Sequence, residues 1–262
     1  RDSFRTTTID NVELTPELKE LEFTLEQIEL GDFEHFMLKE IHEQPTTLYT
    51  SMQGRVDPIS GTITLGGVSE LADELVKAKR VLLLGQGTAL HAAMIGEYLF
   101  EGLAGIPTEV EFASEFRYRN PIVEDGTVAV AVSQSGETAD TLAAIQEAKR
   151  RGATTLGVVN VVGSSIARET DAGVYLRVGP EIGVASTKAF LGQVMALTMM
   201  ALYIGRRRYL SQGYVRQLLQ ELDMIPDHVQ SVLEQSERIK SVIEPFITQE
   251  NWLFLGRGYN YP

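Results

Sequence analysis

The chain has 262 residues, 44% of them hydrophobic, which is enough for one large domain or two small ones with a buried core. It contains no cysteine, which excludes disulfides, thiolate metal sites and cysteine nucleophiles within the chain. The formal net charge of −13 disfavours nucleic acid as a partner.

Two helices are predicted in the N-terminal part of the chain. Apolar residues at positions 18, 21, 25 and 28 recur every three or four residues, which is typical of an amphipathic helix over residues 17–30. A second helix over residues 33–43 is expected to end before Pro45, because proline cannot continue a helix. Residues 55–67 are rich in turn-forming residues and are predicted to form turns.

From residue 81 on, apolar strands alternate with helical patterns. The apolar runs are continuous, so helices should cover both faces of the sheet, and a helix after each strand predicts parallel order. The predicted fold class is therefore α/β, with a doubly wound, mainly parallel sheet flanked by helices. The expected strands are 81–84, 108–111, 127–132, 154–159 and 174–178, and the expected helices between them are 88–103, 114–119, 138–151 and 165–169.

Three long helices are expected after the sheet, at residues 184–203, 214–225 and 227–248. The most apolar stretch, residues 194–204, is too short to span a membrane and is interpreted as a core helix. No signal-peptide pattern is seen, so a cytoplasmic location without a membrane partner is expected.

Two similar short segments form an internal repeat, one at the first predicted strand and one near the C-terminus. Residues 81–87 read Val-Leu-Leu-Leu-Gly-Gln-Gly and residues 252–258 read Trp-Leu-Phe-Leu-Gly-Arg-Gly. Each is an apolar run followed by Gly-x-Gly, which predicts that residue 252 begins a second copy of the same fold. A coincidental strand and turn is the alternative, because a lone Gly-x-Gly is a weak signal.

The most informative segment is residues 133–138, Ser-Gln-Ser-Gly-Glu-Thr, between an apolar strand and a helical pattern. The free N–H groups and the positive dipole end of the helix point into this turn, and its hydroxyl groups add donors. A single Ser here would usually be only a helix cap. Three hydroxyls at the carboxyl end of a buried strand favour an anion site instead, with phosphate the expected anion. The Gly and Lys pattern of a P-loop is missing, so a small phosphorylated metabolite is favoured over a nucleoside triphosphate.

Several acid–base candidates lie near such turns. Glu137 suits the first helical turn electrostatically, and His91 and Lys188 lie just inside helices, so structural roles are favoured for all three. Glu181 is left open between holding its Gly-rich loop and touching substrate. His42 lacks partners for a metal site, and neither a metal nor a cofactor is predicted.

Taken together, the motifs resemble the sugar isomerase (SIS) domain family, and within it the isomerase part of the glutamine–fructose-6-phosphate aminotransferases. The resemblance covers roughly residues 15–262, in order. It is carried by residues 35–45, 54–56, 133–141, 162–166, 179–189 and 255–259.

The resemblance implies a site for fructose 6-phosphate. It assigns the phosphate to Ser133, Gln134, Ser135 and Thr138, with Thr88 contributing from the neighbouring turn. It assigns the sugar to Val184 and Ser186. One departure from the family is Ala89, which stands where the family usually has a serine, so a hydroxyl expected to touch the sugar is missing.

The resemblance also implies how the chain is divided. Residues 1–32 would be the remnant of a glutaminase domain and a linker, residues 33–235 the first SIS domain with a helical extension, and residues 236–262 the beginning of a second SIS domain. The catalytic groups are expected beyond Pro262, so the isolated chain should bind sugar phosphate without turning it over. The expected partners are the glutaminase domain of the same enzyme and a second copy in a homodimer.

Two other functions stay open. One is a different enzyme with two SIS domains, such as a sugar-phosphate deglycase or deaminase. The other is a regulator that senses sugar phosphates through an SIS domain; such proteins carry a helix-turn-helix domain, which is not visible in this sequence.

Overall fold

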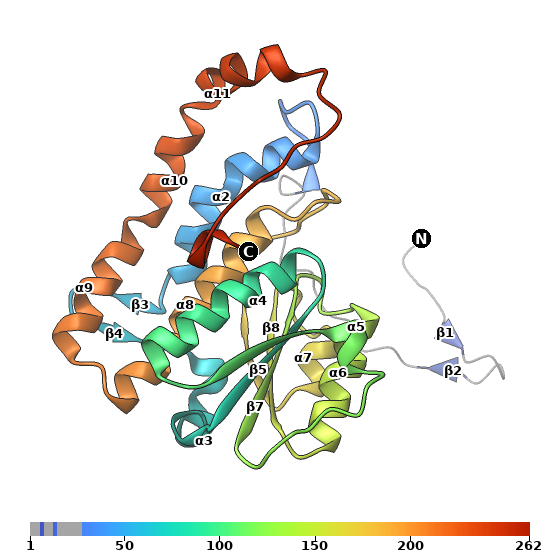
Figure 1. Cartoon of the computed structure of the whole chain (residues 1–262), viewed down its shortest axis with the longest axis vertical. Coiled ribbons are helices and arrows are strands. Elements are labelled where there is room, and N and C mark those ends of the chain that lie inside the picture. Colours follow the sequence, from blue (N-terminus) through green and yellow to red (C-terminus); the bar gives the residue numbers. More distant parts are fainter. Residues whose placement is uncertain (1–5, 8–12, 15–27) are drawn as a thin grey trace.

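The centre of the molecule is a five-stranded sheet. The computed structural model describes residues 6–7, 13–14 and 28–262, so most of the predicted helix 17–30 lies outside the described residues. All neighbouring strands in the sheet are parallel, in the order β6-β5-β7-β8-β9 (Figure 1). The strands are β5 (Arg80–Gly85), β6 (Thr108–Phe112), β7 (Thr127–Ser133), β8 (Thr154–Val159) and β9 (Ala172–Tyr175). The predicted α/β fold class is confirmed.

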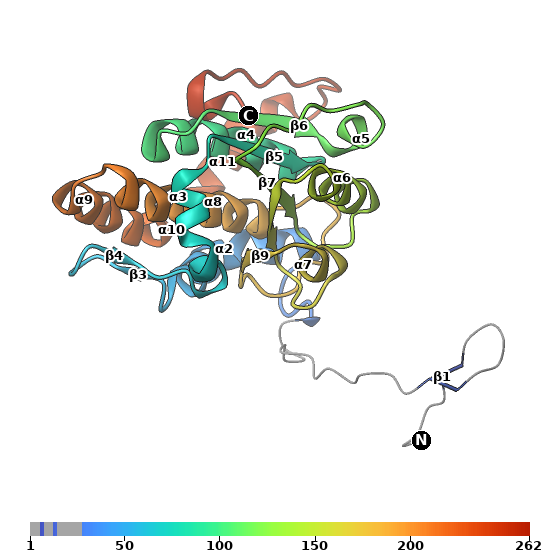
Figure 2. The same cartoon turned by 90° about the horizontal axis from the view of Figure 1, so that it is seen from below.

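Helices cover both faces of this sheet (Figure 2). Alternate residues of β5 enter different cores: Leu83 packs with α4 and α8, whereas Leu82 and Leu84 pack with α6. This alternation explains why the strands are continuous apolar runs, since each face needs its own set of apolar side chains. The helices around the sheet are α3 (Ala72–Lys77), α4 (Thr88–Leu99) continued by a π-helix (Phe100–Ala104), α5 (Ala113–Phe116), α6 (Ala139–Arg150), α7 (Ser165–Glu169) and α8 (Lys188–Arg208).

The prediction that residues 174–178 form a strand is wrong at both ends. Strand β9 covers Ala172–Tyr175, and Tyr175 pairs with Val159, the last residue of β8. No partner strand continues beyond that point, so the chain leaves the sheet and begins a loop.

The helix before the sheet is longer than predicted. Helix α2 runs over Phe36–Met52 and contains Pro45, which was expected to end it. A proline at position 45 cannot donate to the carbonyl of Ile41, but the Gln44 side chain donates to that carbonyl instead, at 2.8 Å. The helix therefore passes through the proline with this acceptor satisfied. Its buried residues Leu48 and Met52 join the core formed by α8.

Helix α8 is the core helix of the molecule. By length and composition it could cross a membrane, but 78% of its apolar window is buried inside the protein. The expected core role is confirmed, although the helix begins and ends later than residues 184–203. Three arginines, Arg206 to Arg208, occupy its last turn, where positive charge is favourable to the helix dipole.

The C-terminal part forms an arm of helices beside α2 (Figure 1). These are α9 (Gln212–Asp223), α10 (Ile225–Leu233) and α11 (Ser236–Ile243), followed by 3₁₀ turns at Glu244–Phe246 and Gly258–Asn260. The single helix predicted for residues 227–248 is thus divided in two. Short strand pairs, β1 (Thr6–Thr7) with β2 (Glu13–Leu14) and β3 (Val56–Asp57) with β4 (Thr62–Ile63), and a 3₁₀ helix at Gly66–Leu71 complete the described elements.

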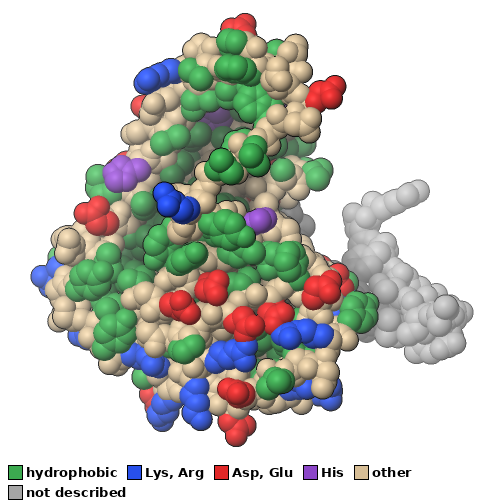
Figure 3. All heavy atoms as spheres, viewed as in Figure 1, with side chains coloured by type: hydrophobic (Ala, Val, Ile, Leu, Met, Phe, Trp, Pro, Cys, Tyr) green, Lys and Arg blue, Asp and Glu red, His purple; other side chains and the backbone are tan. Residues whose placement is uncertain are grey.

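The strand predicted for the second copy of the internal repeat, at residues 252–258, does not form. Residues 251–257 have no regular structure, and Leu253, Phe254 and Leu255 are 84%, 88% and 87% exposed. Figure 3 shows hydrophobic side chains gathered on the face where this segment crosses the molecule. A strand needs a neighbour for its backbone hydrogen bonds, and none of the described strands pairs with this segment. The division into domains at residue 236 stays a prediction.

Candidate functional site

The hydroxyl-rich turn lies at the point where the order of the sheet reverses. Strand β5 is flanked by β6 on one side and by β7 on the other, so the connections after β5 and β7 leave in opposite directions. In open α/β sheets this switch point is where ligands bind, outside the carboxyl ends of the strands. Residues 134–138 follow β7 there, and Thr88 begins α4 after β5. The two parts of the predicted phosphate site are therefore on adjacent strands.

The turn is held in shape by its own side chains. The Ser133 hydroxyl accepts a hydrogen bond from the backbone N–H of Gly136 at 3.1 Å and lies 3.1 Å from the Thr138 hydroxyl. The Ser135 hydroxyl accepts from the N–H of Glu137, also at 3.1 Å. Ser133 is buried, whereas Gln134, Ser135 and Thr138 are partly accessible. The turn is thus preformed, and three of the four phosphate ligands predicted within it are partly accessible to solvent.

Gly136 has a backbone and a neighbour that exclude a side chain. Its φ of 67° lies in the left-handed region, which favours glycine. A Cβ at this position would also collide with the side chain of Ser164, which is 3% exposed. The turn therefore packs directly against the residue that precedes α7.

Thr88 and its neighbour Ala89 have different environments. Thr88 is exposed at the first position of α4, so its hydroxyl is available to a ligand. Ala89 is 8% exposed and belongs to the core between the sheet and α8. The departure from the family's usual serine thus lies at a buried position.

The predicted sugar contacts lie on a different loop. Residues 179–187, here called the sugar loop, form the last part of the connection from β9 to α8, at the same edge of the sheet as the turn after β7. Val184 projects fully into solvent, and the Ser186 hydroxyl donates to Glu181 Oε2 at 2.8 Å. The turn and the sugar loop are separated by β8, the strand between β7 and β9.

Asn160 links these two loops, and sequence reasoning missed it. Its backbone N–H donates to the carbonyl of Gln134 at 3.0 Å. Its side chain donates to the carbonyl of Gly179 at 2.7 Å and accepts from the N–H of Val178 at 3.2 Å. The available signal was its position directly after the apolar run of β8, since polar residues at strand carboxyl ends gather at one edge.

The acid–base candidates have structural contacts in this chain. Glu137 accepts from the N–H of Ser165 at 2.8 Å, and its pKa is lowered by hydrogen bonds from Ser165 and by nearby Arg168. Glu181 Oε1 accepts from the N–H groups of Thr187 and Ala189 at 2.8 and 3.1 Å, which caps the N-terminus of α8. These contacts show that Glu181 holds its own loop, which is one of the two roles considered for it.

Of two further candidates, Lys188 has the predicted structural role, whereas His91 is not packed inside the protein. Lys188 is 3% exposed and pairs with Glu43 at 2.6 Å, and His91 is exposed on α4. Among the described residues, no group of three or more His, Asp or Glu side chains is arranged to hold a metal ion.

Comparison with known proteins identifies the fold. Residues 74–203 match the SIS domain family. This chain carries an SIS domain. The C-terminal domain of glucosamine-fructose-6-phosphate aminotransferase from Francisella tularensis is 36% identical, with a TM-score of 0.83 over 88% of this chain and 64% of that one.

Curated relatives extend the match to the whole chain. The glutamine–fructose-6-phosphate aminotransferase (isomerizing) of Chlorobaculum tepidum is 52% identical over all 262 residues, which span 43% of that protein. The enzyme of the same name from Bacteroides thetaiotaomicron is 46% identical over 97% of this chain and 42% of its own length. The chain thus spans less than half the length of these relatives. The resemblance inferred from the motifs is confirmed, and the SIS-domain chain fits the isomerase portion of this enzyme.

Proposed function

We propose that this chain is the part of an isomerizing glutamine–fructose-6-phosphate aminotransferase that binds fructose 6-phosphate. The observation that carries the proposal is the preformed hydroxyl-rich turn at the switch point of the sheet, in a chain 52% identical to an enzyme of that name. In the whole enzyme the bound sugar would be aminated and isomerised to glucosamine 6-phosphate.

The proposed site has two parts with different tasks. The phosphate is held by Gln134, Ser135 and Thr138, with Thr88 from the adjacent strand, while the buried Ser133 keeps the turn in shape and adds its hydroxyl to the same cluster. Each hydrogen bond to a charged phosphate contributes about 1.5–3 kcal/mol, so several of them hold a small ligand at micromolar to millimolar affinity. Val184 and Ser186 contact the sugar.

Turnover requires groups outside this chain. Three of the acid–base candidates within it are engaged, Glu137 with Ser165, Glu181 with the start of α8, and Lys188 with Glu43, and the fourth, His91, lies exposed on α4. The proposal therefore gives the isolated chain binding without catalysis. It also includes a glutaminase domain as partner, a homodimer, a cytoplasmic location and a product that enters hexosamine synthesis.

Calorimetry on the purified chain tests the proposal. Fructose 6-phosphate should bind with a Kd between about 1 μM and 1 mM, whereas unphosphorylated fructose should not bind detectably. No binding of fructose 6-phosphate at about 10 mM, or equal binding of fructose, would overturn the proposal. Incubation with fructose 6-phosphate and ammonium should yield no glucosamine 6-phosphate, and its formation would show that the chain contains the catalytic groups.

The alternative of a different enzyme with two SIS domains receives less support. Glucosamine-6-phosphate deaminase from Thermotoga maritima is 24% identical with a TM-score of 0.55, a likeness that concerns the fold alone.

A further inference from the structure

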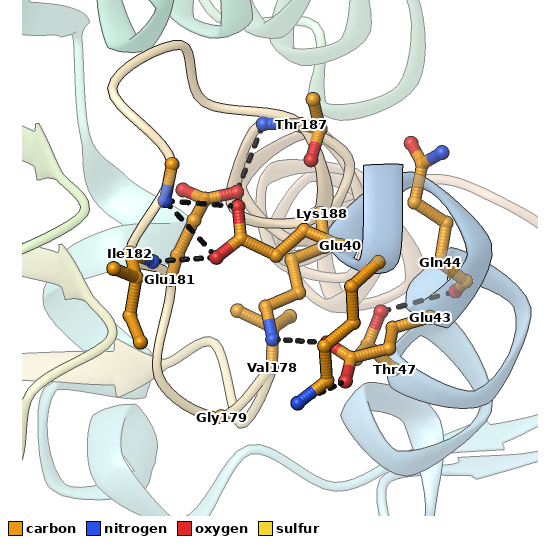
Figure 4. Close-up of polar contacts among 12 residues, drawn as sticks. Glu40, Glu43, Gln44, Thr47, Val178, Gly179, Glu181, Ile182, Thr187 and Lys188 are labelled. Atoms are coloured by element: carbon orange, nitrogen blue, oxygen red, sulfur yellow. Dashed lines mark hydrogen bonds and ion pairs between the residues drawn. The ribbon is translucent and has the colours of Figure 1, made fainter. Parts of the chain in front are cut away.

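The sugar loop is held from outside the SIS domain match. Helix α2 covers Phe36–Met52, and the match begins only at residue 74. One carboxyl group of this helix, that of Glu40, reaches the middle of the loop. Its Oε1 accepts from the N–H of Ile182 at 2.5 Å and from the N–H of Gly183 at 3.1 Å (Figure 4). Its Oε2 lies 3.2 Å from the same Gly183 N–H.

The fit between the two elements is tight. Glu40 is 2% exposed, so its side-chain oxygens have exchanged water for these backbone donors. A Cβ on Gly183 would come 2.6 Å from Glu40 Oε2, so the contact also depends on glycine at that position. Two consecutive N–H groups directed at one carboxyl group fix the path of the backbone immediately before Val184.

Charged side chains near Glu40 hold the C-terminal end of the sugar loop. Glu43, one turn further along α2, pairs with Lys188 at the start of α8. Glu181 caps α8 from within the loop and accepts the Ser186 hydroxyl. Ser186 is thus oriented by Glu181, whereas the segment next to Val184 depends on Glu40.

We infer that Glu40 is a positioning residue for sugar recognition, which acts by holding residues 182–183 so that Val184 faces the bound sugar. The inference rests on the proposed function. It separates the site into a phosphate part built within β7 and α6, and a sugar part whose geometry is set by α2. Loss of the Glu40 contacts should therefore affect recognition of the hexose and spare recognition of the phosphate.

The test compares two ligands on one set of variants. Calorimetry of the chain is done with fructose 6-phosphate and with inorganic phosphate, which reports the phosphate part alone. Glu40→Ala should raise the Kd for fructose 6-phosphate by about tenfold and leave the Kd for inorganic phosphate within about twofold. Glu40→Gln keeps an acceptor oxygen and the side-chain shape, so its effect should be smaller, about threefold.

A second variant alters the same contact by a substitution in the sugar loop. Gly183→Ala places a methyl group against Glu40 and should reproduce the loss of hexose affinity, and the double variant should lose little more than either single one. Glu221→Gln, at an exposed position on α9, is the matched control and should change neither Kd. Amide hydrogen exchange at residues 182 and 183 should accelerate in Glu40→Ala and less in Glu40→Gln.

The outcomes are separable. If the unaltered chain binds fructose 6-phosphate but Glu40→Gln and Gly183→Ala both keep its affinity, the inference is overturned and the proposed function stands. A parallel loss of affinity for both ligands would also overturn it, because that is the result of general destabilisation. If the unaltered chain binds neither ligand, the proposed function fails and the inference fails with it. Glu40→Gln keeps the test valid even if Glu40→Ala does not fold.

Discussion

The Ser135 hydroxyl makes one hydrogen bond inside the turn and keeps its proton free for another. Its oxygen accepts from the N–H of Glu137, and its own proton remains free to donate. Ser133 differs, because it is 2% exposed and its hydroxyl contacts both the N–H of Gly136 and the hydroxyl of Thr138. At the residue scale, the accessible hydroxyl is therefore the better probe of ligand binding.

Ser135→Ala should raise the Kd for fructose 6-phosphate by about tenfold or more, because one hydrogen bond to a charged group is lost. Calorimetry measures this change. The Kd for inorganic phosphate, used as a second ligand, should rise to a similar extent. Ser241→Ala, at an exposed position on α11, is the control. Unchanged affinity in Ser135→Ala would place the phosphate elsewhere.

Gly136→Ala combines two costs that a control can separate. The left-handed backbone costs an alanine about 1–2 kcal/mol, and the collision with Ser164 adds to that. Gly54→Ala is the matched control, since Gly54 has a φ of 72° and a Cβ there would meet no atom within 4 Å. Urea unfolding should show that Gly136→Ala lowers the free energy of unfolding more than Gly54→Ala does. Adding Ser164→Gly to Gly136→Ala should restore part of that free energy. Equal losses at both glycines would contradict the close packing of the turn on Ser164.

At the scale of elements, single polar side chains form hydrogen bonds to backbone groups that have no partner within a helix or strand. Gln44 satisfies the carbonyl that Pro45 cannot, so α2 continues to Met52 and reaches the core. Asn160 joins the turn after β7 to the segment after β9. In both cases a side chain supplies the hydrogen bond that regular structure lacks.

Asp171 makes a similar link between β9, β8 and α6. Its Oδ2 accepts from the N–H and hydroxyl of Thr155 at 2.8 and 2.7 Å, and Lys149 lies 3.1 Å from Oδ1. Partial burial would raise the pKa of Asp171, but the hydrogen bonds from Thr155 and Lys149 outweigh burial and lower that pKa.

A lowered pKa makes the stabilisation by Asp171 dependent on pH. The contribution is fully present above the unfolded pKa of about 3.9 and is lost as the pH falls through the lower folded pKa. The free energy of unfolding should therefore differ most between the unaltered chain and Asp171→Asn near neutral pH, and the two should converge in acid. Urea titrations across this range measure the difference, with Asp125→Asn at an exposed position as control. Parallel pH profiles for the unaltered chain and Asp171→Asn would contradict the assignment.

At the scale of the whole molecule, α2 and the SIS domain share one core. Leu48 and Met52 of α2 are 2% and 4% exposed and lie in the same cluster as the inner residues of α8 and the sheet. The helix that positions the sugar loop is therefore part of the folded unit, although it lies outside residues 74–203.

Leu48→Ala should consequently destabilise the entire unit, by about 2–5 kcal/mol, because it leaves a cavity in the shared core. Circular dichroism in urea, which reports on all helices and strands together, should show one cooperative transition shifted to lower urea. Tyr49→Ala is the neighbouring control: Tyr49 is 58% exposed, and its loss should cost no more than about 0.5 kcal/mol. A separate early transition in Leu48→Ala would mean that α2 unfolds independently.

The order of strands and helices and the hydroxyl-rich turn after β7 follow from the sequence by itself, because apolar runs, helical periodicity and a run of hydroxyl residues are local patterns. Only the tertiary structure decided the rest. Pro45 does not end α2, residues 252–258 do not form a strand, and Asn160 and Glu40 hold loops far from them in the chain. Each of these depends on a hydrogen-bond partner, present or missing, which local spacing does not specify. Glu40 and Ile182 are 142 residues apart, and only folding brings a carboxyl group on one helix to the N–H groups of a distant loop.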